Sequence, residues 1–417
     1  MEKYSEHKET NVFWQTMMPK HWCVMKLRYI LRKLQREKKP NAELLVCSNS
    51  GRVNIKGDNK LGLVAEDDKI YQGVGKGDLL IHGMDTWHGA IAVSEYDGMC
   101  TPVVHVCDST QNKSFVAYYL RNMAYEKVFK LISNGVRQNT SDFRCWDKLA
   151  VVPIILPPLA EQHSIVSYLD KKCSLLDTLL SNKEKEISLL QEMKQRVIAD
   201  AVTRGVNPNA KFKATNIPWL PEIPEHWSLL RNKSFMRQTD EKVGKRKDIT
   251  LLSLTKQGVV VRDLTEGKGK FPKDYETYLI VKPNNLVFCL FDIDETPRTV
   301  GLVRHDGMLT GAYSNFEIIE TKVLPDFAYY YYLQVDDIKG LRPFYTGLRK
   351  VVKANTFAQL RVPVPPLSEQ RAIVSYITER TSKIDTLIEK LTKEIECVKE
   401  YKQRLISDVV TGQVKVC

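Results

Sequence analysis

Acidic side chains supply the first candidate for chemistry in this sequence. Asp292, Asp294 and Glu295 lie close together in "FDIDETPR", and neighbouring carboxylates can hold a metal ion for nuclease chemistry. The lysine that we expect beside such a site, on a neighbouring strand, is not evident in the sequence. The pattern therefore argues against a nuclease centre here.

Motifs for nucleotide and methyl-donor chemistry are also missing from the sequence. "GVGKGD" at Gly73 lacks the glycine spacing of the Gly-x-x-x-x-Gly-Lys-Ser/Thr loop that binds phosphates. "VKPNNL" at Val281 is not the Asn-Pro-Pro-Tyr type of motif found in amino-methyltransferases. Neither motif therefore offers a catalytic residue or a cofactor site in this chain.

The nine cysteines include no Cys-x-x-Cys pair. We expect free, mostly buried thiols in a reducing cytosol. The alternative is a metal cluster built from Cys100, His105 and Cys107, or from His82 and His88. Either set would need a fourth ligand and supporting residues that the sequence does not show, so we expect no metal site.

The composition is typical of a folded protein of two to four domains, with 417 residues, 43% of them hydrophobic and 27% charged. No run of about 18 apolar residues occurs. The first ten residues, "MEKYSEHKET", are polar and charged, unlike a signal peptide, which predicts a cytoplasmic protein with no membrane contact. The net charge of +12 favours an acidic partner such as nucleic acid.

An internal repeat organises the sequence. Residues 157–204 align with residues 365–412 without a gap, and 24 of the 48 positions are identical. "TNVFWQTMMPKHW" from Thr10 also aligns with "TNIPWLPEIPEHW" from Thr215, although the first copy lacks the prolines at Pro218 and Pro221. Between these segments lie weaker matches in the same order, such as "GVRQ" at Gly135 and "GLRK" at Gly347. One unit of about 205 residues is therefore written twice, alike at its end and divergent in its middle.

The similar segments have the periodicity of a coiled coil. From Ser368, a possible helix cap, to Val410 there is no Gly or Pro, and apolar residues repeat along two heptad seams. The first copy follows the same seams except at Lys183, where we expect the helix to fray or bend. Lys194 and Lys402 occupy one seam position in the two copies. They either fix the register of pairing or extend past a loose seam to solvent.

The divergent segments are predicted to be mixed. Short β-branched and aromatic runs between Gly, Asn, Asp and Pro indicate strands, among them "GDLLIHG", "TPVVHVC" and "NNLVFCLF". "SFVAYYLRNMAYEKVFKLI" and "DFAYYYYLQV" indicate helices. Residues 161–204 carry seven basic and seven acidic side chains, and residues 369–412 carry eight of each. The positive excess therefore belongs to the globules and linkers, as expected if helices pair with protein and globules meet a polyanion.

The order globule, helix, globule, helix predicts an α+β fold. If the helices pair with each other they must run antiparallel, with a globule at each end and an approximate two-fold axis between them. A helix of about 40 residues is roughly 60 Å long. That length is a little under two turns of B-form DNA, and half-sites on DNA are typically one turn or a small multiple apart.

The motifs "PPLAEQ…IVSYLD", "PPLSEQ…IVSYIT" and "IPWLPEIPEHW", with the duplicated plan, resemble the specificity (S) subunits of type I restriction-modification systems. The resemblance covers nearly the whole chain. It implies target-recognition domains at 1–157 and 215–365, spacer helices at 158–204 and 366–417, and a linker at 205–214. Each domain would recognise half of a bipartite, asymmetric sequence in double-stranded DNA, and the helices would set the spacing.

The resemblance also implies partners. Two methyltransferase (M) subunits would dock on the helices, supply S-adenosylmethionine and methylate adenine at N6. Restriction (R) subunits would use ATP and Mg for translocation and cleavage, while this chain would catalyse nothing. The residues expected in the spacer and partner helices are Glu161, Gln162, Leu176, Ile187, Leu190, Lys194, Glu369, Gln370, Ile384, Leu391, Ile395 and Lys402.

Candidate DNA contacts come from polar loops, since base edges are recognised mainly by Arg, Lys, Asn and Gln. The candidates are Asn49, Arg52, Arg137, Gln138, Asn139, Lys256, Gln257, Arg349, Lys350 and Lys353. Basic runs suit phosphate better, and these candidates are Arg32, Lys33, Arg36, Lys245, Arg246 and Lys247. The alternative for each is a solvated surface charge. The tyrosines at 329–332 could stack on bases, but a helical row of aromatics is more often core.

Two other functions stay open on the sequence alone. One is a coiled-coil scaffold whose basic globules bind other proteins. The other is a self-sufficient enzyme whose chemistry none of these motifs shows.

Overall fold

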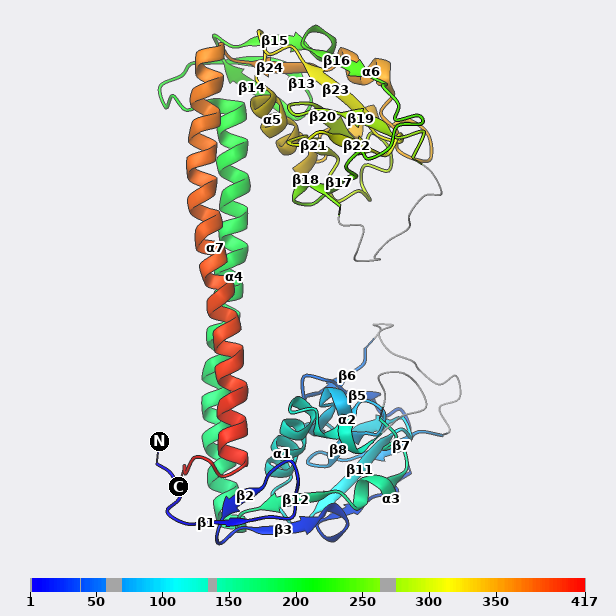
Figure 1. Ribbon diagram of the computed structural model, residues 1–417, viewed down its shortest axis with the longest axis vertical. Helices are drawn as coiled ribbons and strands as arrows, with labels where there is room; N and C mark the ends of the chain where they lie inside the picture. Colours follow the sequence, from blue (N-terminus) through cyan, green and yellow to red (C-terminus); the bar gives the residue numbers. More distant parts are fainter. Residues whose placement is uncertain (1, 38, 58–69, 134–140, 263–274, 417) are drawn as a thin grey trace. The chain divides into compact units, whose positions relative to one another are not determined.

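The computed structural model describes residues 2–37, 39–57, 70–133, 141–262 and 275–416. It consists of two compact units, one formed by residues 1–184 and 393–417 and the other by residues 185–392. Each unit holds one mixed globule and a part of both long helices (Figure 1). We call them unit 1 and unit 2.

Unit 1 is built around a four-stranded antiparallel sheet in the order β4-β11-β8-β9. Helix α1 (Lys113–Tyr125) packs against β8 and β9, and α2 (Val128–Ile132) and α3 (Trp146–Ala150) follow it. The strands of this sheet are β4 (Leu31–Lys33), β8 (Leu79–His82), β9 (Ile91–Val93) and β11 (Val104–Ser109). Four two-stranded pairs complete the globule: β1 (His7–Glu9) with β2 (Met17–Pro19), β3 (Cys23–Lys26) with β12 (Pro153–Leu156), β5 (Leu45–Cys47) with β6 (Val53–Ile55), and β7 (Gln72–Val74) with β10 (Gly98–Cys100).

Unit 2 repeats this topology pair by pair. Its four-stranded sheet has the order β16-β23-β20-β21, and α5 (Pro325–Asp337) packs against β21. The strands are β16 (Met236–Thr239), β20 (Leu286–Phe288), β21 (Val300–Leu302) and β23 (Ser314–Ile318). The two-stranded pairs are β13 (Phe212–Ile217) with β14 (Leu220–Pro224), β15 (Ser228–Arg231) with β24 (Arg361–Val364), β17 (Leu252–Thr255) with β18 (Gly258–Val261), and β19 (Leu279–Val281) with β22 (Gly307–Leu309). The duplication therefore extends through the segments whose sequences have diverged.

The elements predicted from periodicity are largely confirmed. The strand-like runs named above form β8, β11 and β20, and the row of tyrosines lies in α5, where Tyr331 and Tyr332 are fully buried. The long helical prediction at 114–132 is divided between α1 and α2, because Lys127 has a left-handed φ of 59°. Strand β13 starts at Phe212, so it takes up the end of the segment expected to be a linker.

The tryptophan that ends the repeated opening segment is the centre of each globule's attachment. Trp22 is 0% exposed and Trp227 is 1% exposed. Each joins a core that includes residues of the long helices, Ile165 and Leu169 with Trp22, and Ile373 and Ile377 with Trp227. A buried aromatic of this size contributes a large part of the apolar area in such a core, so each globule and its part of the helices share one interior.

The two long helices are continuous, which corrects two expectations. Helix α4 covers Leu159–Arg204 and α7 covers Leu367–Val410. Lys183 does not interrupt α4, because its ammonium group pairs with the Glu394 carboxylate on α7. Ser368 is not the cap, because α7 already begins at Leu367, and the carbonyl of Pro366 accepts hydrogen bonds from the N–H groups of Glu369 and Gln370.

The helices pair antiparallel within each unit, as predicted, so the α+β class with two mixed globules and a coiled coil is confirmed. In unit 1 the residues of α4 from 165 to 173 share a core with the residues of α7 from 405 to 410. In unit 2 the residues from 198 to 202 share a core with residues 373 and 377. Of the predicted seam residues, Ile384, Leu391 and Ile395 are buried, whereas Leu176, Ile187 and Leu190 are half-buried.

The two repeated seam lysines form matched ion pairs across the coiled coil. In unit 2, Lys194 Nζ lies 2.6 and 2.7 Å from the carboxylate oxygens of Asp385. In unit 1, Lys402 Nζ pairs with Asp177. Both lysines and both aspartates are related by the same shift of 208 residues. Each lysine is therefore paired with an aspartate of the other helix, which favours the first of the two alternatives, a role in register.

A mostly buried carboxylate joins the start of each helix to its globule. In unit 1, Glu161 accepts a 3.1 Å bond from Trp22 Nε1 and lies 2.8 Å from His21 Nε2, and Tyr4 also donates to it. In unit 2, Glu369 makes the same contacts to Trp227 at 3.1 Å and His226 at 2.7 Å. A carboxylate in the first turn is also favoured by the positive end of the helix dipole. We call this arrangement the carboxylate clamp.

The glutamine that follows each clamp residue is 0% exposed and bonded on both sides. Gln162 accepts from the Asn112 N–H at the start of α1 (3.0 Å) and donates to the Pro157 carbonyl (2.8 Å). Gln370 accepts from the Leu324 N–H at the start of α5 (2.8 Å) and donates to the Pro365 carbonyl (2.9 Å). The Glu-Gln pair therefore fixes the direction in which each helix leaves its globule.

The clamp predicts a specific stability cost. We expect Glu369→Gln and Glu161→Gln each to cost about 1–2 kcal/mol, because hydrogen bonds to a charged, mostly buried group are lost or weakened. Urea unfolding of the full chain, followed by tryptophan fluorescence, would measure the shift. Glu379→Gln is the matched control, since Glu379 forms an ion pair with Lys383 on an exposed helix surface. Equal shifts for clamp and control would contradict the role of the clamp.

The cross-helix ion pairs predict charge-swap behaviour. We expect Lys194→Asp to cost about 0.5–1 kcal/mol, because it places two aspartates together at a partly exposed position. The double variant Lys194→Asp with Asp385→Lys restores opposite charges and should recover most of the loss. A double-mutant cycle by urea unfolding checks this. Simple additivity of the two single losses would show that the pair does not contribute to pairing.

Candidate nucleic-acid interface

Two equivalent hairpin turns carry predicted DNA contacts. Asn49 and Arg52 lie in the turn between β5 and β6, and Lys256 and Gln257 lie in the turn between β17 and β18. All four side chains are exposed. Since these hairpins correspond in the two topologies, the structure brings the sequence-predicted loops to the same place in each globule.

The turn of unit 1 is tied to its surroundings. Arg121 donates a 3.0 Å bond to the Ser50 carbonyl, and Gly51 has a φ of +72°, which favours glycine. Arg52 lies 3.7 Å from the Asp177 carboxylate of α4, yet its side chain stays 73% exposed. Asp177 is also the partner of Lys402, so a predicted DNA contact and the register pair share one carboxylate.

The basic loop of unit 2 lies against the acidic segment that first suggested a nuclease. Arg349 Nη2 lies 2.7 Å from an Asp292 carboxylate oxygen. Lys350 Nζ lies 2.7 Å from Glu295 and 3.2 Å from Asp294. The acidic residues are therefore paired with cations, and among the described residues no group of three or more His, Cys, Asp or Glu side chains is placed to hold a metal ion.

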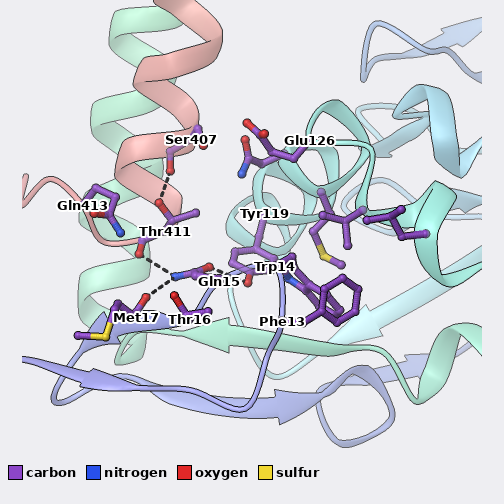
Figure 2. A pocket seen from close by; sticks show the side chains of 14 residues that line it. Phe13, Trp14, Gln15, Thr16, Met17, Tyr119, Glu126, Ser407, Thr411 and Gln413 are labelled. Atoms are coloured by element: carbon purple, nitrogen blue, oxygen red, sulfur yellow. Dashed lines mark hydrogen bonds between the residues drawn. The ribbon is translucent and has the colours of Figure 1, made fainter.

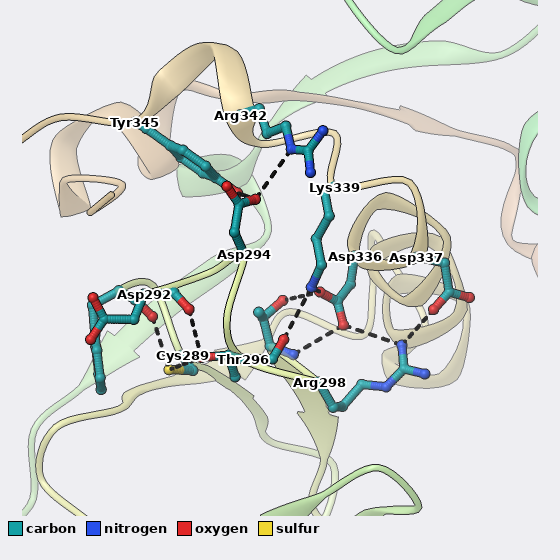
Figure 3. A network of polar contacts seen from close by, with 12 residues as sticks. Cys289, Asp292, Asp294, Thr296, Arg298, Asp336, Asp337, Lys339, Arg342 and Tyr345 are labelled. Atoms are coloured by element: carbon teal, nitrogen blue, oxygen red, sulfur yellow. Dashed lines mark hydrogen bonds and ion pairs between the residues drawn. The ribbon is translucent and has the colours of Figure 1, made fainter. Parts of the chain in front are cut away.

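Further cations complete this network (Figure 3). Burial alone would raise the pKa of Asp294, but hydrogen bonds from Arg342 and Lys350 outweigh it and lower that pKa. The bond from Lys350 likewise lowers the pKa of Glu295. Nearby, the Asp336 carboxylate accepts from Thr299, Arg298 and Lys339. The lowered pKa values favour the charged forms of Asp294 and Glu295, and the contacts of Asp336 join Thr299 and Arg298 to the end of α5.

The residues predicted to contact phosphate differ in how closely they pair with carboxylates of the chain. Arg32 and Lys33 lie on the sheet-edge strand β4 and are exposed, with Arg32 3.3 Å from Asp108. Arg36 pairs with Asp78, which is 4% exposed, while the arginine side chain itself stays 44% exposed. A buried carboxylate needs such a partner.

In unit 2 the run from Lys245 to Lys247 is exposed, and Arg246 lies 2.7 Å from Glu241. Lys353 is exposed at the residue before α6 (Ala354–Gln359). The remaining candidates, Arg137, Gln138 and Asn139, lie outside the described residues. Unit 2 therefore presents two exposed basic segments, one after β16 and one before α6.

Several partner-helix candidates have internal roles. Glu161, Gln162, Glu369 and Gln370 form the junctions described above, and Lys194 and Lys402 form the ion pairs. The other halves of these contacts, His21 with His226 and Asp177 with Asp385, were not predicted from the sequence. A signal was present, because each of these residues recurs at the offset of its repeated segment.

A cavity of about 700 Å³ in unit 1 lies between the N-terminal segment, α1 and the end of α7 (Figure 2). Gln15 crosses it, donating 2.8 Å to the Thr411 carbonyl and accepting 3.0 Å from the Tyr119 hydroxyl. Burial raises the pKa of Tyr119, which keeps this donor protonated. These bonds join both ends of the chain to α1.

Of the cysteine and histidine candidates, Cys100, His105 and Cys107 are buried, His82 is half-buried and His88 is exposed. Burial raises the pKa of Cys100 and of Cys107 to about 12, which disfavours the thiolate that a metal requires. His105 Nε2 lies 2.6 Å from the Phe143 carbonyl. Across the described ranges, none of the helices is long and apolar enough to cross a bilayer.

Comparisons with known proteins agree with this architecture. Residues 293–397 match the family described as type I restriction modification DNA specificity domain. The putative type I restriction enzyme MjaX specificity subunit of Methanocaldococcus jannaschii is 26% identical over 379 residues, which cover 87% of this chain and 77% of that protein. The MjaVIII specificity subunit of the same organism is 25% identical over 278 residues, which cover 64% of this chain and 63% of that protein.

A solved structure extends the likeness of fold to nearly the whole chain. It is described as "Structural basis underlying complex assembly and conformational transition of the type I R-M system", and it matches with a TM-score of 0.69 at 12% identity, covering 95% of this chain and 99% of that chain. The duplicated globule-and-helix fold, the matched domain and the two relatives lead to one conclusion. The chain is similar in sequence to specificity subunits of type I restriction-modification systems, and it shares its fold with a chain of a type I R-M system.

Proposed function

We propose that this chain selects the DNA sequence on which a type I restriction-modification complex acts. Each globule recognises one half of a bipartite, asymmetric target in double-stranded DNA. The observation that carries the proposal is one topology presented twice with different side chains at equivalent turns, Asn49 and Arg52 in unit 1 and Lys256 and Gln257 in unit 2. Two globules with the same topology but different side chains at their turns suit the recognition of two different half-targets.

The distribution of charge supports a nucleic-acid partner for the globules. The net charge is +12, while residues 161–204 and 369–412 are neutral. A basic globule attracts the phosphate backbone and gains affinity by releasing counterions. The neutral, paired helices then act as the spacer between two DNA-binding globules.

Exposed apolar side chains on the helices fit two copies of one protein partner. In unit 1, Leu179 is 40% exposed and Tyr401 is 52% exposed. In unit 2, Leu387 is 48% exposed and Met193 is 52% exposed. Leu387 follows Leu179, and Tyr401 follows Met193, by 208 residues, so each unit presents an equivalent apolar pair. We assign these pairs to two methyltransferase (M) subunits.

The chemistry belongs to the partners in this proposal. The M subunits supply S-adenosylmethionine and methylate adenine at N6, a reaction that requires the base to leave the stack. Restriction (R) subunits supply ATP- and Mg-dependent translocation and cleavage. This chain positions those subunits on DNA in the cytoplasm and is itself non-catalytic.

A reconstitution experiment tests the proposal. Plasmid DNA is incubated with S-adenosylmethionine and either this chain, the M subunit from the same host, or both, and modified adenines are mapped by long-read sequencing. We expect site-specific N6-methyladenine only with both proteins, in one bipartite, asymmetric motif. Methylation by this chain alone would indicate an enzyme. No DNA binding even in the mixture would favour a protein-binding scaffold.

The docking assignment predicts a change in stoichiometry. We expect Tyr401→Asp or Met193→Asp to reduce bound M subunits from two to one, and the double variant to bind none, because a charge replaces an apolar contact. Native mass spectrometry counts the subunits. Ile319→Asp is the control, since Ile319 is an exposed apolar residue outside the helices (40% exposed). Retention of two M subunits by the double variant would refute the assignment.

A further inference from the structure

The tip of one loop in unit 2 exposes a leucine completely. Leu348 is 103% exposed, and it lies between Gly347 and the cations Arg349 and Lys350. Single exposed apolar residues are common on proteins. A fully exposed leucine directly followed by two cations, on a globule proposed to bind DNA, suits a contact outside the chain.

The loop is held in a defined shape. Thr346 and Val351 exchange two main-chain hydrogen bonds of 2.9 and 3.0 Å, and the Lys350 N–H donates to the Gly347 carbonyl at 3.1 Å. Gly347 has a φ of +72° and Lys350 a φ of +47°, so the turn depends on left-handed backbone. A tip closed in this way loses little conformational entropy when it meets a ligand.

The arginine beside the tip is oriented in advance. The Asp292 N–H donates 2.9 Å to the Arg349 carbonyl, and the Asp292 carboxylate binds Arg349 Nη2 at 2.7 Å. The guanidinium carbon lies 5.2 Å from the centre of the Phe291 ring, as in a cation–π contact. The side chain nevertheless stays 70% exposed. A guanidinium has five N–H donors, so the pairing through Nη2 leaves donors for another partner.

The acidic residues beside this loop favour a contact with a base over a contact with the phosphate backbone. Asp292, Asp294 and Glu295 all lie within ion-pair distance of the cations of this loop. Three carboxylates repel a phosphate backbone, so a loop that served only to bind phosphate would be weakened by them. The Asp292 carboxylate binds one N–H group of the Arg349 guanidinium. The remaining N–H groups suit a neutral acceptor, such as the edge of a base.

We infer that residues 346–351 form a base-recognition tip, in which Arg349 donates two hydrogen bonds to O6 and N7 of a guanine and Leu348 packs against the neighbouring base. The inference rests on the proposed function and identifies the base that this part of the site recognises. Arg with guanine is the commonest specific pairing in the major groove. Asp292 acts as a positioning residue for Arg349.

The first globule carries a matching sequence. "GVRQ" at Gly135 has the same order of glycine, aliphatic residue, arginine and polar residue as "GLRK" at Gly347. The first of these segments lies outside the described residues. The recurrence of the pattern in both globules supports a shared recognition element, with a different side chain at its fourth position.

The experiment measures binding of the complex of this chain with its M subunits to duplexes. The panel contains the mapped target and a set of derivatives. In each derivative, one G·C pair of the half-target recognised by the globule of unit 2 is changed to A·T. We expect the wild type to lose about tenfold or more in affinity at one such pair. Arg349→Ala and Arg349→Lys should bind that derivative and the target equally well. Lysine keeps the charge but not the two-pronged geometry. Leu348→Ser should weaken target binding severalfold at an unchanged unfolding midpoint.

Each other outcome overturns the inference in a recognisable way. If Arg349→Ala weakens binding to all duplexes alike, or if Arg349→Lys keeps full discrimination, Arg349 contacts phosphate instead. If both Leu348→Ser and Arg349→Lys leave DNA binding unchanged but lose the M subunits, the tip is a protein contact. If the wild-type complex discriminates between no duplexes, the proposed function itself fails.

Discussion

The architecture depends on a carboxylate held in the first turn of each long helix. Glu161 and Glu369 are bonded by the indole and imidazole of the same repeated His-Trp pair, and the following glutamine is bonded both to the end of the preceding strand and to the start of an internal helix. The shared core around Trp22 or Trp227 packs each helix against its globule, and these bonds fix the direction of the helix at its first turn.

Pairing of the helices adds the second constraint. Apolar seams provide most of the stability of such a pair, but they allow neighbouring registers. The Lys194–Asp385 and Lys402–Asp177 contacts restrict the choice, because a shift by one heptad would separate both charges from their partners. The pair between Lys183 and Glu394 is different, since the residue equivalent to Lys183 is Leu391, which is buried. The contacts at the two helix starts are therefore repeated more faithfully than the contacts between the helices.

The sequence alone predicted the order and type of the elements, but not the contacts between side chains that are distant in the chain. A repeat of 208 residues, apolar heptads and short strand-like runs predicted the helices, the globules and their order, because these depend on local periodicity. The pairing of Arg349 with Asp292 and of Arg36 with Asp78 could not be predicted, because the partners are 57 and 42 residues apart and meet only through the tertiary fold. The internal use of Glu161 and Gln162 was missed for a related reason: a repeated residue can contact its own chain or a partner, and the repeat alone does not say which.

The exposure of the turns between β5 and β6 and between β17 and β18 affects how the chain can change during evolution. Asn49, Lys256 and Gln257 are exposed at their turns, so substitution there alters surface chemistry with little effect on the core. The clamp and seam residues, in contrast, are bonded in ways that few substitutions preserve. Tolerance to mutation is thus concentrated in the loops that we propose to select the DNA target. A lineage could acquire a new specificity through a small number of substitutions while the assembly that carries it stays intact.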